Sequence, residues 1–282
     1  MKYFRTFPTV EYDLQKDNVV EKITDVFRRV IVREDLNNYI NTFSKLTLNS
    51  SERPELAANK IYGDVDLHWV LMFMNKVIDP YHDWVMDQVT FENYINKKYP
   101  NNHILLDSNH FTVTDYGNAT GDTGERSFIE GETIVEYDSG GSGVTGDSGN
   151  IVKFDSTIRQ IIYSTVSGTL GGVNYIKGEQ SGAVGKSVSS GAEKDAAHHY
   201  ESTAPLEKTK DKDRSSSEQT PFWVNRGYTS TFKDSEDNAY AAITISNLDY
   251  EDKLNEDKRH IKTLDSSFLG RFTSEFQEKI AK

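Results

Sequence analysis

The chain has 282 residues, of which 36% are hydrophobic, and a length of this order permits one large domain or two to three small ones. Its formal net charge of −12 opposes binding to nucleic acid and to anionic membrane surfaces, and the absence of cysteine excludes disulfides, thiol catalysis and thiolate metal sites. Because no apolar run is long enough to span a bilayer and no signal peptide is recognisable, we expect a soluble, unsecreted protein.

Residues 1–44 are predicted to form an N-terminal arm and a helix. The segment "YFRTFPTVEYD" (3–13) is predicted to be extended, and "NVVEKITDVFRRVIV" (18–32) to be helical. The helix is predicted because apolar residues recur there at three- and four-residue spacing, at Val19, Ile23, Val26, Phe27 and Val30. Such an apolar arm either packs beneath its own domain or lies on a neighbouring molecule, and the sequence leaves both alternatives open.

Residues 45–99 are predicted to form a small domain with the order strand, helix, helix, strand. A strand is expected over 39–48, followed by a helix that begins at Pro54 and ends at Gly63. A second helix, from Leu67 to about Asn75 and capped by Asp64 or Asp66, is apolar on nearly all sides and must be covered on most of them. Trp69 is therefore expected in the core. "DWVM" (83–86) is the predicted return strand.

Residues 103–190 are predicted to be a Gly-rich, all-β insert that forms a small barrel or sandwich. Sixteen of the 19 glycines lie between positions 117 and 191, where short β-type segments alternate with Ser-Gly turns. "GSGVTG" (141–146) formally matches a dinucleotide-binding pattern, but a strand follows it instead of the required helix. "GDSG" (146–149) lacks aligned partners for a serine protease, and its glycines are attributed to turns.

Residues 191–247 are predicted to be a polar loop, to about position 221, followed by strands over 222–232 and 238–248. Within the loop, His198, His199 and Glu201 are chemically suitable zinc ligands. Adjacent side chains of an extended segment point to opposite sides, so a packing or hydrogen-bonding role is expected, and no metal site is predicted.

Residues 248–282 are predicted to be a helical C-terminal segment. Its charged part, "EDKLNEDKR" (251–259), is interpreted as a solvated helix. A short amphipathic helix capped by Asp265 or Ser266 follows. Its apolar stripe requires a partner surface and consists of Phe268, Phe272, Phe276 and Ile280.

The predicted strand, helix, helix, strand order resembles a LysM domain, and residues 53–84 resemble the version found in the baseplate wedge protein 53 family of contractile-tailed bacteriophages. "YFRTFPTVEYD", "ITDVFRRV", "HHYE" and "YEDKLNEDKRHIKTLD" are similar to further segments of that family. The insert 103–190 does not match it. The expected fold class is therefore α+β, with a LysM-like βααβ domain, the all-β insert, the extended arm and the helical C-terminal segment.

This resemblance implies a structural subunit of the virion tail baseplate, assembled in the host cytoplasm, that has neither catalytic activity nor a cofactor. Six copies would join neighbouring wedges into a ring around the hub, with other baseplate wedge proteins as partners. The resemblance and the apolar arms make the following residues partner-binding candidates: Phe7, Pro8, Tyr12, Phe27, Arg28, Tyr62, Gly63, Trp69, Asn75, Asp79, Pro80, Trp84, His198, His199, Tyr250, Asn255, Arg259, Phe272 and Phe276.

Two other functions remain open from the sequence. The first is a LysM-type protein that binds peptidoglycan. The second is a receptor-binding β-module within residues 117–191.

Overall fold

The computed structural model describes residues 3, 7–13, 16, 19–28, 30, 43–49, 52–107, 126–137, 144–171, 174–202, 224–225, 227–233 and 239–281. The chain divides into two compact units. Unit 1 consists of residues 1–91 and 253–282, and unit 2 of residues 92–252. No helix in the described ranges is long and apolar enough to cross a membrane.

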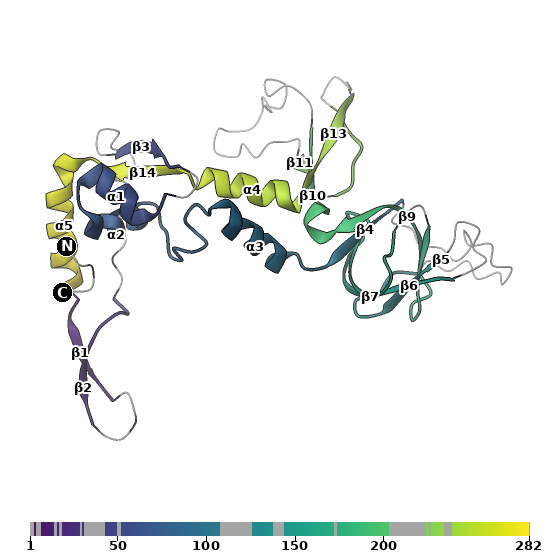
Figure 1. The fold of residues 1–282 in the computed structure, drawn as a ribbon, viewed down its shortest axis with the longest axis horizontal. Helices are drawn as coiled ribbons and strands as arrows, with labels where there is room; N and C mark the ends of the chain where they lie inside the picture. Colours follow the sequence, from purple (N-terminus) through teal and green to yellow (C-terminus); the bar gives the residue numbers. More distant parts are fainter. Residues whose placement is uncertain are drawn as a thin grey trace. The chain divides into compact units, whose positions relative to one another are not determined.

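Unit 1 begins with a two-stranded antiparallel hairpin of β1 (Thr9–Tyr12) and β2 (Glu21–Thr24), in which Val10 lies opposite Ile23 (Figure 1). The predicted extended conformation is confirmed for β1. The helix predicted over 18–32 is wrong where β2 forms. Stiff β-branched side chains such as Ile23 and Thr24 favour a strand, and pairing with β1 satisfies the backbone.

The middle of unit 1 contains β3 (Phe43–Thr47), α1 (Pro54–Tyr62), a 3₁₀ helix (Val65–Leu67) and α2 (His68–Met74). As predicted, α1 starts with proline and ends at Gly63, whose φ of 73° is the left-handed conformation that glycine adopts without strain. Asp64 accepts a hydrogen bond from the backbone N–H of Asp66 at 2.8 Å and so caps the following turn.

The strand that pairs with β3 comes from the far end of the chain. β14 (His260–Leu264) runs antiparallel to β3. The return strand predicted over 83–86 is therefore wrong, and so is the helical prediction at 260–264. Trp84, Val85 and Met86 are buried, but they lie in a non-strand segment. The apolar run correctly indicated that these residues are buried, but a short apolar run does not distinguish a strand from other conformations.

Two apolar clusters form the core of unit 1, and α2 lies between them. Helix α5 (Ser266–Ala281), capped as predicted by the Asp265 carboxylate on the Ser267 N–H, contributes Phe276 and Ile280 to the first cluster. This cluster also contains Trp69 and Val70. The second contains Leu48, Ala57, Ala58, Leu71, Trp84, Val85 and Ile261. Adjacent residues of α2 thus enter different clusters, which explains why this helix is apolar on nearly all sides.

The chain passes from unit 1 to unit 2 within α3 (Gln88–Lys98) and returns to unit 1 within α4 (Asn247–Asp257). Helix α4 was predicted from the sequence, whereas α3 was not. In unit 2 the buried Glu251 carboxylate accepts hydrogen bonds from Lys98 Nζ at 2.6 Å and from the Tyr99 hydroxyl at 3.0 Å. Burial and this carboxylate raise the pKa of Tyr99 to about 12.

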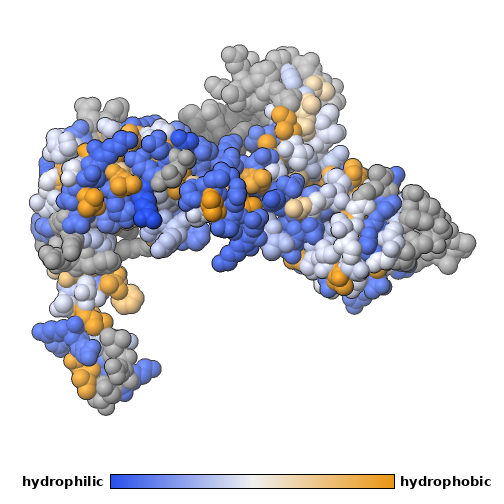
Figure 2. Space-filling view, in the orientation of Figure 1, coloured by the Kyte–Doolittle hydropathy of each residue, from blue (hydrophilic) through white to orange (hydrophobic). Residues whose placement is uncertain are grey.

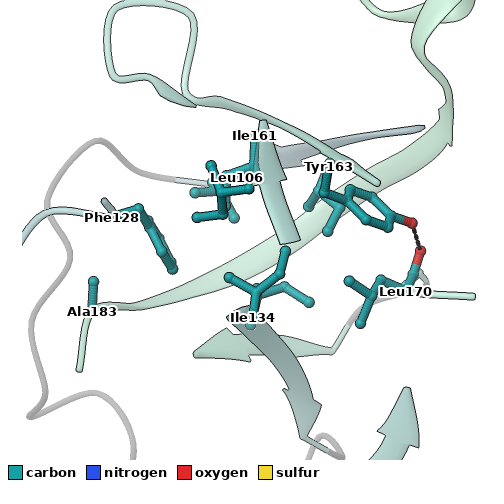
Figure 3. Close-up of a cluster of buried hydrophobic side chains, with 10 residues drawn as sticks. Leu106, Phe128, Ile134, Ile161, Tyr163, Leu170 and Ala183 are labelled. Carbon is teal, nitrogen blue, oxygen red and sulfur yellow. Dashed lines mark hydrogen bonds between the residues drawn. The ribbon is translucent and has the colours of Figure 1, made fainter. Parts of the chain in front are cut away.

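Six antiparallel strands in unit 2 form a closed barrel, with the order β4-β7-β6-β5-β8-β9. They are β4 (Asn102–Leu106), β5 (Thr133–Tyr137), β6 (Val144–Asp155), β7 (Gln160–Ser167), β8 (Tyr175–Gly178) and β9 (Val184–Ala192). Of the two predicted forms, a small barrel or a sandwich, the structure has the barrel. Figure 3 shows its core, where the Tyr163 hydroxyl donates a hydrogen bond to the Leu170 carbonyl at 3.0 Å.

One glycine of "GDSG" serves a purpose other than a turn. Gly149 lies inside β6, and a Cβ at this position would come within 2.5 Å of the Tyr163 ring. The glycine therefore permits close approach of the backbone to a core side chain.

A second sheet in unit 2 has the order β11-β10-β13-β12. Its strands are β10 (Ala197–Ser202), β11 (Val224–Asn225), β12 (Thr231–Lys233) and β13 (Ala239–Ser246). The loop predicted over 191–221 is wrong at β10. The strand predicted over 222–232 divides into β11 and β12 at opposite edges of the sheet, whereas the strand predicted over 238–248 corresponds to β13.

Candidate interaction surface

The structure divides the predicted partner-binding residues of unit 1 into a buried group and an exposed group. Trp69 and Phe276 are buried against each other, with ring centroids 4.7 Å apart, and Phe272 stacks on Trp69 at 6.0 Å. These residues form the core of unit 1 and leave little surface for a partner.

Two asparagines among the candidates join distant parts of unit 1. The Asn75 side chain accepts a hydrogen bond from Lys262 N and donates one to Lys262 O, both at 2.8 Å. The buried Asn255 side chain pairs with Met86 in the same way, at 2.9 Å to N and 3.2 Å to O. Each amide therefore takes the place of a backbone neighbour, and at Met86 it pairs backbone groups that are buried.

Three further candidates make single contacts of the same kind. Tyr62 accepts a hydrogen bond from Leu264 N at 3.0 Å, and its burial raises the pKa of its hydroxyl. Arg259 Nε donates to Leu48 O at 3.0 Å, and Trp84 Nε1 to Glu52 O at 2.8 Å. These residues hold β14 and the segment before α3 against the rest of unit 1.

The exposed group is concentrated in the arm, which we define as residues 7–13 and 19–28. Phe27 is 91% exposed and Tyr12 is 56% exposed. The exposed apolar set of the arm also includes Val10, Val19, Val20 and Val26. Figure 2 shows hydrophobic residues, in orange, on the hairpin. Exposed apolar residues concentrated in one segment, as here, indicate an interaction site.

The base of the arm is fixed to the core of unit 1. Phe7 is buried in the cluster that contains Trp69, Val30 packs against the same cluster, and Arg28 NH1 donates a hydrogen bond to Ile280 O at 3.4 Å. Pro8 accepts a hydrogen bond from Asp25 N at 2.8 Å. The Asp25 carboxylate accepts hydrogen bonds from Phe27 N and Arg28 Nε, so the turn that presents the Phe27 ring is held in place.

A second exposed feature of unit 1 is the turn that contains Asp79 and Pro80. Ile78 and Tyr81 are 75% and 80% exposed there, and the sequence analysis did not select either. The Asp83 carboxylate accepts hydrogen bonds from Ile78 N and Asp79 N, and Asp79 contacts His82 Nδ1 at 2.5 Å. The hydrogen bond with His82 is the main reason that the pKa of Asp79 lies below its ordinary value. In the sequence, Ile78 and Tyr81 flank Asp79-Pro80, and apolar residues on both sides of such a turn could have indicated this exposed site.

His198, His199 and Tyr250 form a separate cluster in unit 2. A bulge in β10 lets the adjacent histidines meet, with their Nδ1 atoms 2.8 Å apart, although an ideal strand would separate them. His198 stacks on Tyr250 at 3.9 Å, and His199 Nε2 lies 3.1 Å from Glu201. Within the described residues, no group of three or more His, Cys, Asp or Glu side chains is arranged to hold a metal ion.

Comparison with known proteins connects the N-terminal part of the chain to one family. Residues 3–119 match the family described as Base plate wedge protein 53. The chain is also 33% identical, over 104 residues, to the baseplate wedge protein gp53 of Enterobacteria phage T4. That alignment covers 35% of this chain and 52% of the relative, so the chain spans about half the length of the protein it matches.

The matched residues 3–119 include the arm, β3, α1, α2 and the Asp79–Pro80 turn, whereas β14 and α5 lie outside them. The match also reaches into the insert predicted over 103–190, so the expectation that the insert does not match the family is wrong for 103–119. The predicted resemblance to the wedge protein 53 family is thus confirmed for the N-terminal part. "HHYE" and "YEDKLNEDKRHIKTLD" lie beyond the matched residues. Over residues 3–119, the chain is similar to a baseplate wedge protein of bacteriophages.

Proposed function

We propose that the chain is a structural subunit of a bacteriophage tail baseplate, and that it joins neighbouring wedges into the ring around the hub. The observation that carries the proposal is the exposed apolar arm, which lies within the residues similar to wedge protein 53. A subunit that joins others needs an apolar surface that becomes buried on assembly.

The energetics of the arm favour a partner. An isolated two-stranded hairpin is at best marginally stable in water, because one ladder of hydrogen bonds hardly offsets the loss of chain entropy. Burial of the Phe27 ring alone would contribute about 1.5–3 kcal/mol. The fixed turn at Asp25 lowers the entropic cost of presenting that ring.

The proposed partners are other baseplate wedge proteins and adjacent wedges of a six-fold assembly, in the virion tail after assembly in the host cytoplasm. The net charge of −12 argues against nucleic acid and anionic membranes as partners. We propose a non-enzymatic role, in which the chain acts by contact.

The proposal is tested by placing a photo-crosslinking amino acid at Phe27 in a phage whose own copy of the gene is deleted and replaced. Irradiation of purified tails should join the chain to another baseplate protein or to a second copy of itself. The same amino acid at Thr24, an exposed residue of β2 that lies opposite Thr9, is the matched control and should give fewer products. Equal products at both positions, or a chain absent from purified tails, would reject the proposal.

A second variant tests whether the apolar face matters. Phe27→Asp should reduce the number of complete tails seen by electron microscopy, because a charge cannot be buried cheaply at an interface. Thr24→Asp adds the same carboxylate at an exposed position of β2 and should leave the number of complete tails unchanged. A normal tail count with Phe27→Asp would contradict a role of the arm in assembly.

A second candidate function rests on the order of elements in unit 1. We propose that β3, α1, α2 and β14 form the LysM-like βααβ domain, which would permit binding of peptidoglycan. Retention of the full chain on purified cell walls, competed by soluble glycan fragments, would support this function. A chain that stays in the supernatant at all salt concentrations would dismiss it.

A further inference from the structure

A cavity of about 470 Å³ lies in unit 2, and one of its lining residues is His198 of the cluster described above. It is bounded by the β6–β7 hairpin on one side and by the start of β10 and α4 on the other, through Asp155, Gln160, Glu193, His198 and Asn247 among others. Its volume falls within the range of about 300–1,000 Å³ that is typical of ligand sites.

Strand periodicity explains why this wall is both buried and polar. Ile161 and Tyr163 of β7 point into the barrel core, so Gln160 and Ile162 point to its outer face. Both outward residues are nevertheless only 7% exposed, because the barrel is covered here. A buried glutamine in such a position needs hydrogen-bond partners.

Three side chains around the cavity have an acceptor oxygen with no donor in the described part of the chain. The buried Oε1 atom of Gln160 has no hydrogen-bond partner among the described residues, which is costly for a buried acceptor. Asp155 accepts bonds from the N–H groups of the β6–β7 turn through Oδ1 alone, and Glu193 accepts bonds from Asn101 through Oε2 alone. In the described part of the chain, the second oxygen of each carboxylate has no donor.

The charge around the cavity favours a cation. Asp155 and Glu193 outnumber Lys153, whose exposed side chain can hold its ammonium in water. Ile158, Ile162 and Ala197 supply an apolar wall suited to methylene groups. The planar His198 ring is held by stacking on Tyr250.

We propose that this cavity binds the guanidinium group of an arginine side chain from a partner protein. A guanidinium presents five N–H donors in a plane, which matches several separated acceptors, whereas an ammonium is a single point charge. The methylene groups of the arginine side chain would lie along the apolar wall of the cavity. The site is separate from the arm of unit 1, so the proposal stands whether or not the chain joins baseplate wedges.

The test is a titration of the full-length chain followed by NMR, with the side-chain amide of Gln160 as reporter. The probe is N-acetyl-arginine methylamide, which has no free carboxylate. The lysine analogue keeps the charge, and the citrulline analogue keeps the shape but is neutral. We expect saturable shifts at cavity residues with the arginine probe, affinity lower by roughly fivefold with the lysine probe, and no saturation with citrulline.

Two variants make the test specific. Asp155→Asn should weaken binding of the arginine probe by roughly fivefold. Glu179→Gln removes one exposed carboxylate elsewhere in unit 2 and should change the affinity by less than about twofold, because distant charges are screened. Absence of saturable shifts, equal binding of citrulline, or an equal effect of the two variants would each overturn the proposal. Gln160→Met should also weaken binding of the arginine probe. If Gln160→Met does not fold, the result with Asp155→Asn decides the test.

Discussion

The side-chain amide of Asn75 pairs with both backbone polar groups of Lys262, 187 positions further along the chain. Asn75 lies at the end of α2 and Lys262 in the middle of β14. The contact therefore joins β14 to the helix that was predicted from its apolar surface to be covered on most sides. Asn255 makes the equivalent contact with Met86.

Replacement of Asn75 should weaken unit 1. Asn75→Ala removes both hydrogen bonds to β14, and we expect a loss of about 1–3 kcal/mol in the free energy of unfolding. Urea unfolding monitored by tryptophan fluorescence measures this loss, since Trp69 and Trp84 lie in unit 1. Asn59→Ala, on the exposed side of α1, is the control and should not destabilise the protein. Equal midpoints for the two variants would contradict the structural role of Asn75.

The stripe of α5 allows a direct comparison of buried and exposed phenylalanines. Phe276→Ala should cost about 3–5 kcal/mol, because it leaves a cavity beside Trp69. Phe268→Ala should cost less than about 1 kcal/mol, because Phe268 is 41% exposed. Denaturant unfolding of both variants checks the difference. A large cost at Phe268 would mean that the stripe is covered along its whole length.

The exposed part of the arm should contribute little to the stability of the isolated chain. Phe27→Ala is expected to change the free energy of unfolding by no more than about 0.5 kcal/mol, because the ring makes little contact within its own chain. Phe7→Ala, at the buried base of the arm, is the comparison and should be clearly destabilising. Thermal unfolding of the purified chain measures both. A strong effect of Phe27→Ala would place that ring in the core and remove it from the interaction surface.

The Asp79–Pro80 turn should loosen in acid. Asp83 has a lowered pKa because it accepts hydrogen bonds from Asp79 N and Ile78 N, and Asp79 has a lowered pKa chiefly because of His82. A carboxyl whose pKa is lower in the folded state stabilises the fold at pH values above its ordinary pKa of 3.8, and this contribution is lost as the pH falls through the folded value. Protonation therefore removes the acceptors that hold Ile78 and Tyr81.

Hydrogen exchange of the Ile78 and Asp79 amides, corrected for the intrinsic effect of pH, measures this loosening. Protection should be constant near neutral pH and should fall below pH 3.8. Asp83→Asn should lower the protection at neutral pH and remove most of its pH dependence. Protection that stays unchanged in acid would show that other contacts hold the turn.

Much of the fold followed from the sequence where local chemistry decides the conformation. Pro54 and Gly63 predicted the two ends of α1 because each residue restricts or permits a particular backbone conformation. Phe268, Phe272, Phe276 and Ile280 predicted α5 through their spacing. Short segments separated by glycines predicted an all-β module, either a barrel or a sandwich, and the structure has the barrel. The resemblance of the N-terminal part to wedge protein 53 was also visible in the residues themselves.

Tertiary structure alone decided which distant segments pair. An isolated strand such as "HIKTL" carries no information about its partner, so the pairing of β14 with β3 could not be derived from either segment. The apolar residues of 18–32 fit the period of a helix, but pairing with β1 made a strand of 21–24. The same limit applies to the surface. The sequence predicted burial of Trp69 from its all-round apolar helix, but Phe27 is also a large apolar residue, and only the tertiary structure left its ring 91% exposed.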